Sequence, residues 1–183
     1  MGHLIFRNSG KNHYYTDMKG YSRYLLRCFE GMTKPMEVDF ANKVCCKDFI
    51  GINVRCGNDF VSKESGKRGF IKTRLSWFSH ALHEVRQNYG RMPAIIVSDG
   101  GRSQLAGLLK EQDVYMLNSK TAAADILVLA RSKVLLASGN SSFSAWASFL
   151  GEMDTFTSPE TPFHHGQGLE YGRDGKKIIG FIG

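Results

Sequence analysis

The sequence predicts an α/β protein in which a parallel β-sheet carries helices on both faces, and three observations lead to this fold class. Short apolar runs alternate with longer amphipathic segments from Phe49 to Leu150. The runs are continuously apolar, as in Val134–Ala137, which is typical of strands that are buried on both sides. One longer segment, Thr121–Ser132, is nearly all apolar and is therefore expected to be a buried helix. Strands that alternate with helices in this way form parallel sheets, whose ligands bind at the carboxyl ends of the strands.

The first part of the chain is less regular than the rest. Residues 1–20 have no clear period, and residues 31–48 show no decisive pattern. Between them we expect a short helix from Tyr21 to Phe29, with one face made of Tyr21, Tyr24, Leu25 and Cys28. We therefore divide the chain into an N-terminal segment, residues 1–48, and a domain that comprises residues 49–183.

Within that domain the expected elements follow in a regular order. Strands are expected at Phe49–Val54, Ala94–Val97, Val114–Leu117 and Val134–Ala137, with a last one possible within Lys177–Ile182. A basic, glycine-containing loop after the first strand runs to Arg68. Helices are expected at Arg74–Tyr89 (which Gly90 ends), Ser103–Glu111, Thr121–Ser132, and from the turn Ser138–Ser142 to Leu150.

The composition favours a basic, soluble protein with anionic partners. The 183 residues carry a formal charge of +7, which suits nucleotides, nucleic acid or an acidic membrane surface. The basic residues are scattered rather than gathered in one stripe, so only the sign of the charge is informative. The sequence has no apolar run of membrane-spanning length and no signal-peptide pattern, so we expect a cytoplasmic protein and leave peripheral membrane attachment open.

No metal site is predicted. The four cysteines, two of them the adjacent Cys45 and Cys46, do not have metal-ligand spacing and are expected to be reduced thiols. The pair His164–His165 lacks a third ligand at a suitable spacing and is expected to lie in a polar loop.

Polar residues follow three of the expected strands. Arg55 follows the first, Asp99 the second, and Ser141 and Ser142 the last, so the topology predicts that all of them lie at one edge of the sheet. An arginine fork, serine hydroxyls and the amides of a helix N-terminus together make a seat for a diphosphate. The alternative for the serine turn, and for Asp99, is an ordinary helix N-cap.

Asp125 is the one acid in the apolar segment Thr121–Ala130. Burying an unpaired carboxylate there would be unfavourable, so the carboxylate is expected to have a partner. It could accept hydrogen bonds from N1–H and the N2 amino group of guanine. The alternative is a carboxylate at a helix start that the helix dipole and a nearby Lys or Arg satisfy.

Three stretches together resemble the fucosyltransferases that use GDP-fucose. Asn53-Val54-Arg55-Cys56-Gly57-Asn58-Asp59 is similar to their His-Val-Arg-Arg-Gly-Asp motif, and Ile96-Val-Ser98-Asp99 to their Phe-Ser-Asp-Asp strand end. The block from Asp125 to Trp146, with Asn140-Ser141-Ser142-Phe143 inside it, resembles a block of the α-1,2-fucosyltransferases and, in its Ser-Ser-Phe form, the protein O-fucosyltransferases. The resemblance covers residues 49–150 in the family's order.

This resemblance implies the donor-binding, C-terminal, Rossmann-like domain of a GT-B glycosyltransferase. The resemblance also implies that transfer inverts the configuration at the anomeric carbon of fucose and that no cofactor or metal is tightly bound. Arg55 would be the catalytic residue that holds the β-phosphate, and Asp125 would read guanine. The other residues expected to bind the donor are Asn53, Gly57, Asp99, Asn140, Ser141, Ser142 and Phe143. The expected partners are a nucleotide-sugar donor, a glycan acceptor and, because residues 1–48 are only a linker or remnant of an acceptor domain, a separate acceptor-domain chain or a membrane surface.

The chain departs from the family motif at three positions, where Asn53, Cys56 and Asn58 replace its histidine, second arginine and aspartate. Two other functions therefore stay open. One is an inactive GDP-sugar-binding domain, which the lost cation at Cys56 and the short N-terminal segment favour. The other is a basic nucleic-acid-binding module, which only the charge suggests, and no nucleic acid is expected as a partner.

Overall fold

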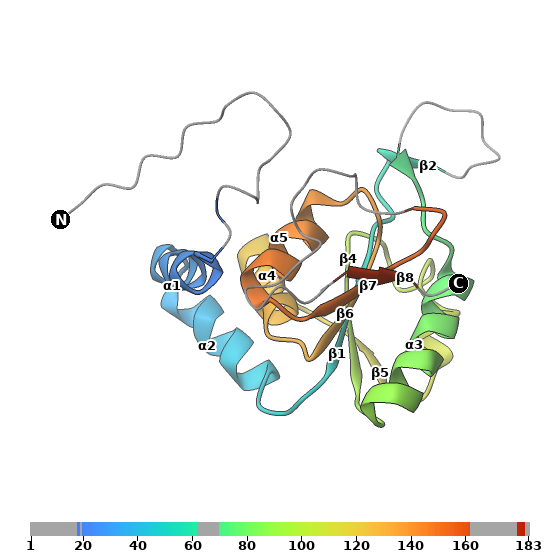
Figure 1. Ribbon diagram of the computed structural model, residues 1–183, viewed down its shortest axis with the longest axis horizontal. Coiled ribbons are helices and arrows are strands. Elements are labelled where there is room, and N and C mark those ends of the chain that lie inside the picture. The colour runs from blue at the N-terminus through green and yellow to red at the C-terminus, as the bar shows by residue number, and fades with distance from the viewer. Residues whose placement is uncertain (1–17, 19, 62–69, 162–178, 182–183) are drawn as a thin grey trace.

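The fold is built on a six-stranded parallel sheet. A computed structural model of the chain describes residue 18 and residues 20–61, 70–161 and 179–181. The strand order is β5-β4-β1-β6-β7-β8, and every neighbouring pair is parallel. The strands are β1 (Ile50–Val54), β4 (Ala94–Ser98), β5 (Val114–Met116), β6 (Val134–Ala137), β7 (Asp154–Thr157) and β8 (Ile179–Phe181). Two short strands, β2 (Phe60–Val61) and β3 (Phe70–Ile71), pair with each other beside this sheet (Figure 1).

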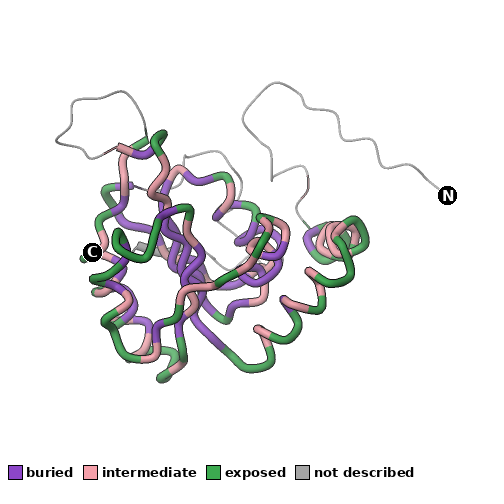
Figure 2. The backbone as a smooth tube through the Cα atoms, turned by 180° about the vertical axis from the view of Figure 1, so that it is seen from behind, coloured by how far each residue is buried: buried purple, intermediate pink, exposed green. Residues whose placement is uncertain are grey.

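Helices cover both faces of the sheet, as predicted. Ile50, Ile52 and Val54 of β1 pack in one core with α3 (Leu75–Tyr89) and the short 3-10 helix η2 (Leu108–Lys110). The opposite face packs against α4 (Ala122–Ala130) and α5 (Ser142–Gly151). The sheet therefore runs buried through the middle of the molecule (Figure 2), and β1 and β6 are buried at every residue.

Two further helices, α1 (Ser22–Met32) and α2 (Pro35–Val44), lie outside α4 and α5 (Figure 1). The predicted apolar face of α1 is correct for Leu25, which packs toward the core with Leu26 and Phe29. It is wrong for Tyr21 and Tyr24, which are about half exposed. Amphipathic tyrosines are tolerated at such a surface, which blurred the pattern. The stretch without a pattern, residues 31–48, contains α2, which Pro35 starts as a first-turn proline.

Two other predictions are corrected. The segment Ser103–Glu111 is not an α-helix but a series of turns that ends in η2. Its bonds mostly join residues three apart, as in Gln104 N to Gly101 O and Ala106 N to Ser103 O, and glycines at both 101 and 107 weaken any longer helix. The strand β7 was not predicted from the sequence. Its two buried residues are Thr155 and Thr157, so the segment lacks the aliphatic residues that mark a buried strand.

The remaining elements match the predicted ones to within a few residues. β1, β4, β5, β6, α3, α4 and α5 lie where the alternating pattern placed them, and β8 falls inside Lys177–Ile182. The loop before Arg68 lies partly, and His164–His165 wholly, outside the described residues. No helix among the described residues is long and apolar enough to cross a membrane.

Candidate functional site

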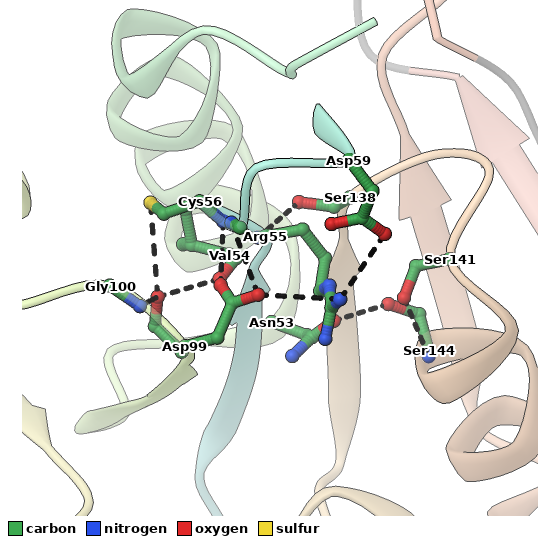
Figure 3. A network of polar contacts seen from close by, with 12 residues as sticks. Asn53, Val54, Arg55, Cys56, Asp59, Asp99, Gly100, Ser138, Ser141 and Ser144 are labelled. Atoms are coloured by element: carbon green, nitrogen blue, oxygen red, sulfur yellow. Dashed lines mark hydrogen bonds and ion pairs between the residues drawn. The ribbon is translucent and has the colours of Figure 1, made fainter. Parts of the chain in front are cut away.

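Arg55 extends from the carboxyl end of β1 and is held by two carboxylates (Figure 3). Its guanidinium lies 3.3 Å from an oxygen of Asp99 and 3.6 Å from an oxygen of Asp59. It also lies over the ring of Phe60, 5.2 Å from the ring centre. The side chain is 27% exposed, and its Nε is buried without a hydrogen-bond partner. The guanidinium is therefore held in place by two carboxylates while part of the side chain stays exposed to a ligand.

Asp99 organises the loop that follows Arg55. Its carboxylate accepts hydrogen bonds from the amides of Cys56, at 2.6 Å, and Gly57, at 3.1 Å. A methyl group added at Gly57 would lie 2.8 Å from an oxygen of Asp99, so the close approach requires glycine. The alternative N-cap role of Asp99 is wrong, since no α-helix follows it and its oxygens bind the neighbouring loop. Asp99 therefore positions Arg55 from an adjacent strand.

The base of this region is a buried hydrogen-bond brace. The side-chain amide of Asn53 donates from Nδ2 to the carbonyl of Val97 at 3.2 Å, and its Oδ1 accepts from the hydroxyl of Ser144 at 2.6 Å. Asn53 therefore ties β1 to β4 and α5, with its polar groups already bonded. Figure 3 shows the bond to Ser144. One residue that the sequence did not single out is Ser138, whose hydroxyl accepts from the amide of Arg55 at 2.9 Å.

The turn between β6 and α5 is both a helix cap and a source of free donors. The hydroxyl of Ser141 accepts from the amide of Ser144 at 3.3 Å, so the capping alternative is correct for Ser141. Asn140 has a positive φ of 57°, a conformation that asparagine tolerates better than most residues. The amides of Ser142 and Phe143, at the start of the helix, have no acceptor in the described part of the chain. A capped helix start and an anion site are therefore compatible here.

A pocket of about 290 Å³ opens at this edge of the sheet and brings together residues from three strand ends and two helices. Five of the predicted site residues line it: Asn53, Arg55, Asp99, Asp125 and Phe143. Four others, Gly57, Asn140, Ser141 and Ser142, are not among its lining residues and belong to the two loops beside it.

Asp125 lies in this pocket, in the first turn of α4. Burial raises the pKa of its carboxyl above the ordinary value, while a short hydrogen bond from the hydroxyl of Ser119 acts in the opposite direction. Its helix-start position agrees with the dipole alternative, but no Lys or Arg pairs with it among the described residues. The carboxylate is thus half-buried with acceptor capacity facing the pocket.

The sequence analysis missed the loop Ser119–Thr121, which lines the pocket beside Asp125. Thr121 caps α4 by accepting from the amide of Ala124 at 3.3 Å, and Lys120 adds a cation. The signal was present, because this loop follows β5 and the strand-end argument applies to it as well. No group of three or more possible metal ligands occurs among the described residues.

The comparisons with known proteins concern the family and the fold of the chain. The model of glycosyl transferase family 11 matches residues 24–167. No curated protein matches the chain in sequence. A crystal structure of POFUT1 in complex with GDP-fucose is similar at 11% identity and a TM-score of 0.51, over 82% of this chain and 46% of that one.

Two further solved structures are similar to the chain to different degrees. POFUT1 in complex with GDP is similar at 11% identity and a TM-score of 0.51, over 68% of this chain and 46% of that one. NodZ α-1,6-fucosyltransferase soaked with GDP-fucose has 17% identity and a TM-score of 0.42, over 70% of this chain and 45% of that one. The chain therefore spans about half the length of the structures that it matches. Since the family model matches most of its residues, the chain belongs to glycosyl transferase family 11.

Proposed function

We propose that this chain binds GDP-fucose and is the donor-binding half of a fucosyltransferase. The observation that carries the proposal is the single pocket that Arg55, Asp125 and Phe143 line, next to the start of α5. Membership of glycosyl transferase family 11 supports sugar transfer. The structures of POFUT1, whose fold is similar to this one, are described as complexes with GDP and GDP-fucose.

In this proposal the pocket divides between base and diphosphate. Asp125, when ionised, accepts from N1–H and the N2 amino group of guanine, and the burial that raises its pKa makes that pairing strong once formed. The diphosphate lies against Arg55 and the amides of Ser142 and Phe143, where the helix dipole adds to their attraction. Lys120 supplies a further cation beside the pocket.

The proposed reaction is an inverting displacement at the anomeric carbon of fucose. The acceptor hydroxyl forms the new C–O bond as the bond between that carbon and the β-phosphate oxygen breaks. GDP leaves with the bonding electron pair, and the acceptor hydroxyl gives up its proton to water. Charge therefore develops on the β-phosphate, where the fixed guanidinium of Arg55 stabilises it without needing to move. The acceptor is proposed to be a glycan, in the manner of the α-1,2-fucosyltransferases.

A second candidate is a GDP-sugar-binding domain without transferase activity. Cys56 favours it, because the thiol stands where the family motif has a second arginine and so removes a cation from the loop. Donor binding without transfer to any glycan would select this candidate.

The proposal is tested by comparing GDP, ADP, UDP and GDP-fucose in calorimetric titrations with the whole chain. We expect GDP and GDP-fucose to bind and the other two nucleotides to bind at least about 10-fold more weakly, because only guanine matches an ionised Asp125. Equal or tighter binding of ADP or UDP would contradict the guanine role of Asp125. Absence of binding by all four would contradict the donor site itself.

A further inference from the structure

A second, larger pocket of about 420 Å³ opens on the α3 side of the sheet. It lies between the start of α3 and the loop that follows β7, and Trp77, His80 and Glu160 are among the residues that line it. Its volume is within the range of about 300–1,000 Å³ that is usual for small-molecule sites. None of the residues assigned to the donor site belongs to it.

The lining combines an apolar flank with neutral polar groups. Trp77 supplies an aromatic surface, and Ser76 and Ser158 add hydroxyls. The two charges of the rim compensate each other, since Arg74 lies 3.9 Å from the carboxylate of Glu160 and both side chains are more than half exposed. Such a site does not favour a phosphate. It suits a sugar ring, whose C–H face packs on an aromatic side chain and whose hydroxyls donate to a carboxylate and accept from a guanidinium.

The wall of this pocket is in contact with the serine turn of the donor site. Thr161 lines the pocket, and its buried hydroxyl is 2.7 Å from the hydroxyl of Thr73 on the α3 side. Its backbone lies against Gly139 so closely that a methyl group at Gly139 would be 1.3 Å from the carbonyl oxygen of Thr161. In a nucleotide sugar, one oxygen joins the sugar ring to the β-phosphate. A sugar pocket must therefore lie close to the phosphate seat, and the wall of this one contacts the turn that leads into that seat.

We propose that the pocket of Trp77, His80 and Glu160 is a subsite for a neutral sugar ring, with Trp77 against the ring and the Arg74–Glu160 pair bonded to its hydroxyls. The assignment as a subsite rests on the proposed donor function. The sugar comes either from the fucosyl group of the donor or from the end of the acceptor glycan. The two sources share the same chemistry, and the test distinguishes them.

The test uses the indole N–H signals of the whole, ¹⁵N-labelled chain. The chain has two tryptophans, so the spectrum contains two indole signals, and Trp77→Leu identifies the signal of Trp77. Trp146 lies on α5 outside the pocket and serves as an internal reference for the free sugars, because GDP is proposed to bind at the start of the same helix. The probes are GDP, GDP-fucose, L-fucose, lactose and N-acetyllactosamine, the last three with and without saturating GDP, and glycerol at equal concentration shows the effect of a simple polyol.

We expect at least one of these sugars, but not glycerol, to shift the signal of Trp77 saturably and to leave that of Trp146 in place. A shift with GDP-fucose that GDP does not cause assigns the donor sugar. A shift with lactose or N-acetyllactosamine in the presence of GDP assigns the acceptor. Glu160→Gln, at an exposed position that tolerates substitution, should weaken the binding of the same sugar about 10-fold. His83→Ala, one turn farther along α3 and outside the pocket, should bind the sugar like the parent chain.

The subsite is contradicted if no probe sugar shifts Trp77 saturably, or if Glu160→Gln binds the sugar as the parent does. Calorimetry of GDP on the same samples separates this outcome from failure of the donor site. Binding of GDP without any effect of sugars on Trp77 would refute the subsite alone. Absence of GDP binding would refute the proposed function, whether or not Trp77 responds to sugars.

Discussion

At the scale of single residues, the donor pocket contains side chains that are held in place but do not have partners for all of their hydrogen-bonding groups. Arg55 is fixed by Asp99 and Asp59, yet its Nε has no partner. Asp125 has one hydroxyl partner and a carboxyl whose pKa burial raises. Asn53 is different, because its amide is already bonded to Val97 and Ser144. We therefore expect ligand binding to depend directly on Arg55 and Asp125, and only indirectly on Asn53.

Asp125→Asn should abolish the preference for guanine without reducing stability. The amide presents its N–H₂ group toward the guanine donors, so GDP should bind about as weakly as ADP. A folded-state pKa that is raised means that the ionised carboxyl disfavours folding at neutral pH, so removing its charge should leave the melting temperature equal or slightly higher. Calorimetry and thermal unfolding of the variant and the parent measure both effects. A large fall in melting temperature with GDP affinity retained would assign Asp125 a structural role instead.

Donor binding should weaken as the pH falls through the raised pKa of Asp125. The protonated carboxyl can no longer accept from both guanine donors, so the affinity for GDP-fucose should begin to fall at a higher pH than an ordinary aspartate would produce. GDP-fucose is the appropriate probe, because its diphosphate has no terminal phosphate that titrates near neutral pH. The same pH series with Asp125→Asn is the control, since Asp59 and Asp99 remain in it. Identical pH profiles for the two chains would contradict the role of Asp125.

The strand-end argument placed the candidate residues well, since it needs only parallel strands and their order. Arg55, Asp99 and Asp125 do line one pocket. The sequence could not show which polar groups are already satisfied by partners far away in the chain. The bonds from the amide of Arg55 to the hydroxyl of Ser138 and from the hydroxyl of Ser144 to Asn53 join residues more than 80 positions apart. Such pairs leave no local pattern in the sequence.

At the scale of elements, the turn between β6 and α5 connects the two pockets. On one side it leads into the capped start of α5, and on the other Gly139 lies against the backbone of Thr161. The turn therefore holds the phosphate seat and the proposed sugar pocket at a fixed spacing. Its strand and helix were predicted because β6 is continuously apolar and Ser141 is a strong cap.

Gly139→Ala should displace this turn. The new methyl group would lie 1.3 Å from a backbone oxygen that has no rotamer to relieve the clash, so we expect a loss of about 1–3 kcal/mol of stability and loss of donor binding. Chemical unfolding and GDP calorimetry measure the two effects. Gly31→Ala, where nothing lies within 4 Å of the new group, is the matched control and should raise stability by about 0.4–1 kcal/mol. Equal behaviour of the two variants would show that the turn adapts freely.

The elements that the sequence missed have physical reasons. β7 is a strand with buried threonines, and the hydroxyl of Thr155 is satisfied by Ser148 of α5 at 2.8 Å, a tertiary contact that the pattern cannot reveal. α2 begins at Pro35 and has a mixed sequence, and its stability comes from packing on α4. The sequence predicted a helix at residues 103–111. The glycines there disfavour an α-helix, and the observed hydrogen bonds mostly join residues three apart.

At the scale of the whole molecule, two separate pockets open toward the carboxyl edge of the sheet. The donor pocket lies on its α4 and α5 side, and the proposed sugar pocket on its α3 side. The chain spans about half the length of POFUT1, so in the proposed function this edge faces an acceptor half that another segment or chain supplies. The fold class followed from the alternation of strands and helices. The position of an acceptor half relative to this domain did not follow, because the alternation of strands and helices describes only one domain.

The central claim is that GDP-fucose binds against Arg55, and titration calorimetry of Arg55→Ala tests it most directly. Arg91→Ala is the matched control, since Arg91 also pairs with an aspartate, Asp113, but lies outside the donor pocket. Loss of a charge-assisted contact to the diphosphate should lower the affinity of Arg55→Ala for GDP-fucose about 10- to 100-fold. Arg91→Ala should bind GDP-fucose with the affinity of the parent chain. The fold should survive, because Asp99 still binds the amides of Cys56 and Gly57. A folded Arg55→Ala chain that binds GDP-fucose with the affinity of the parent would contradict the account.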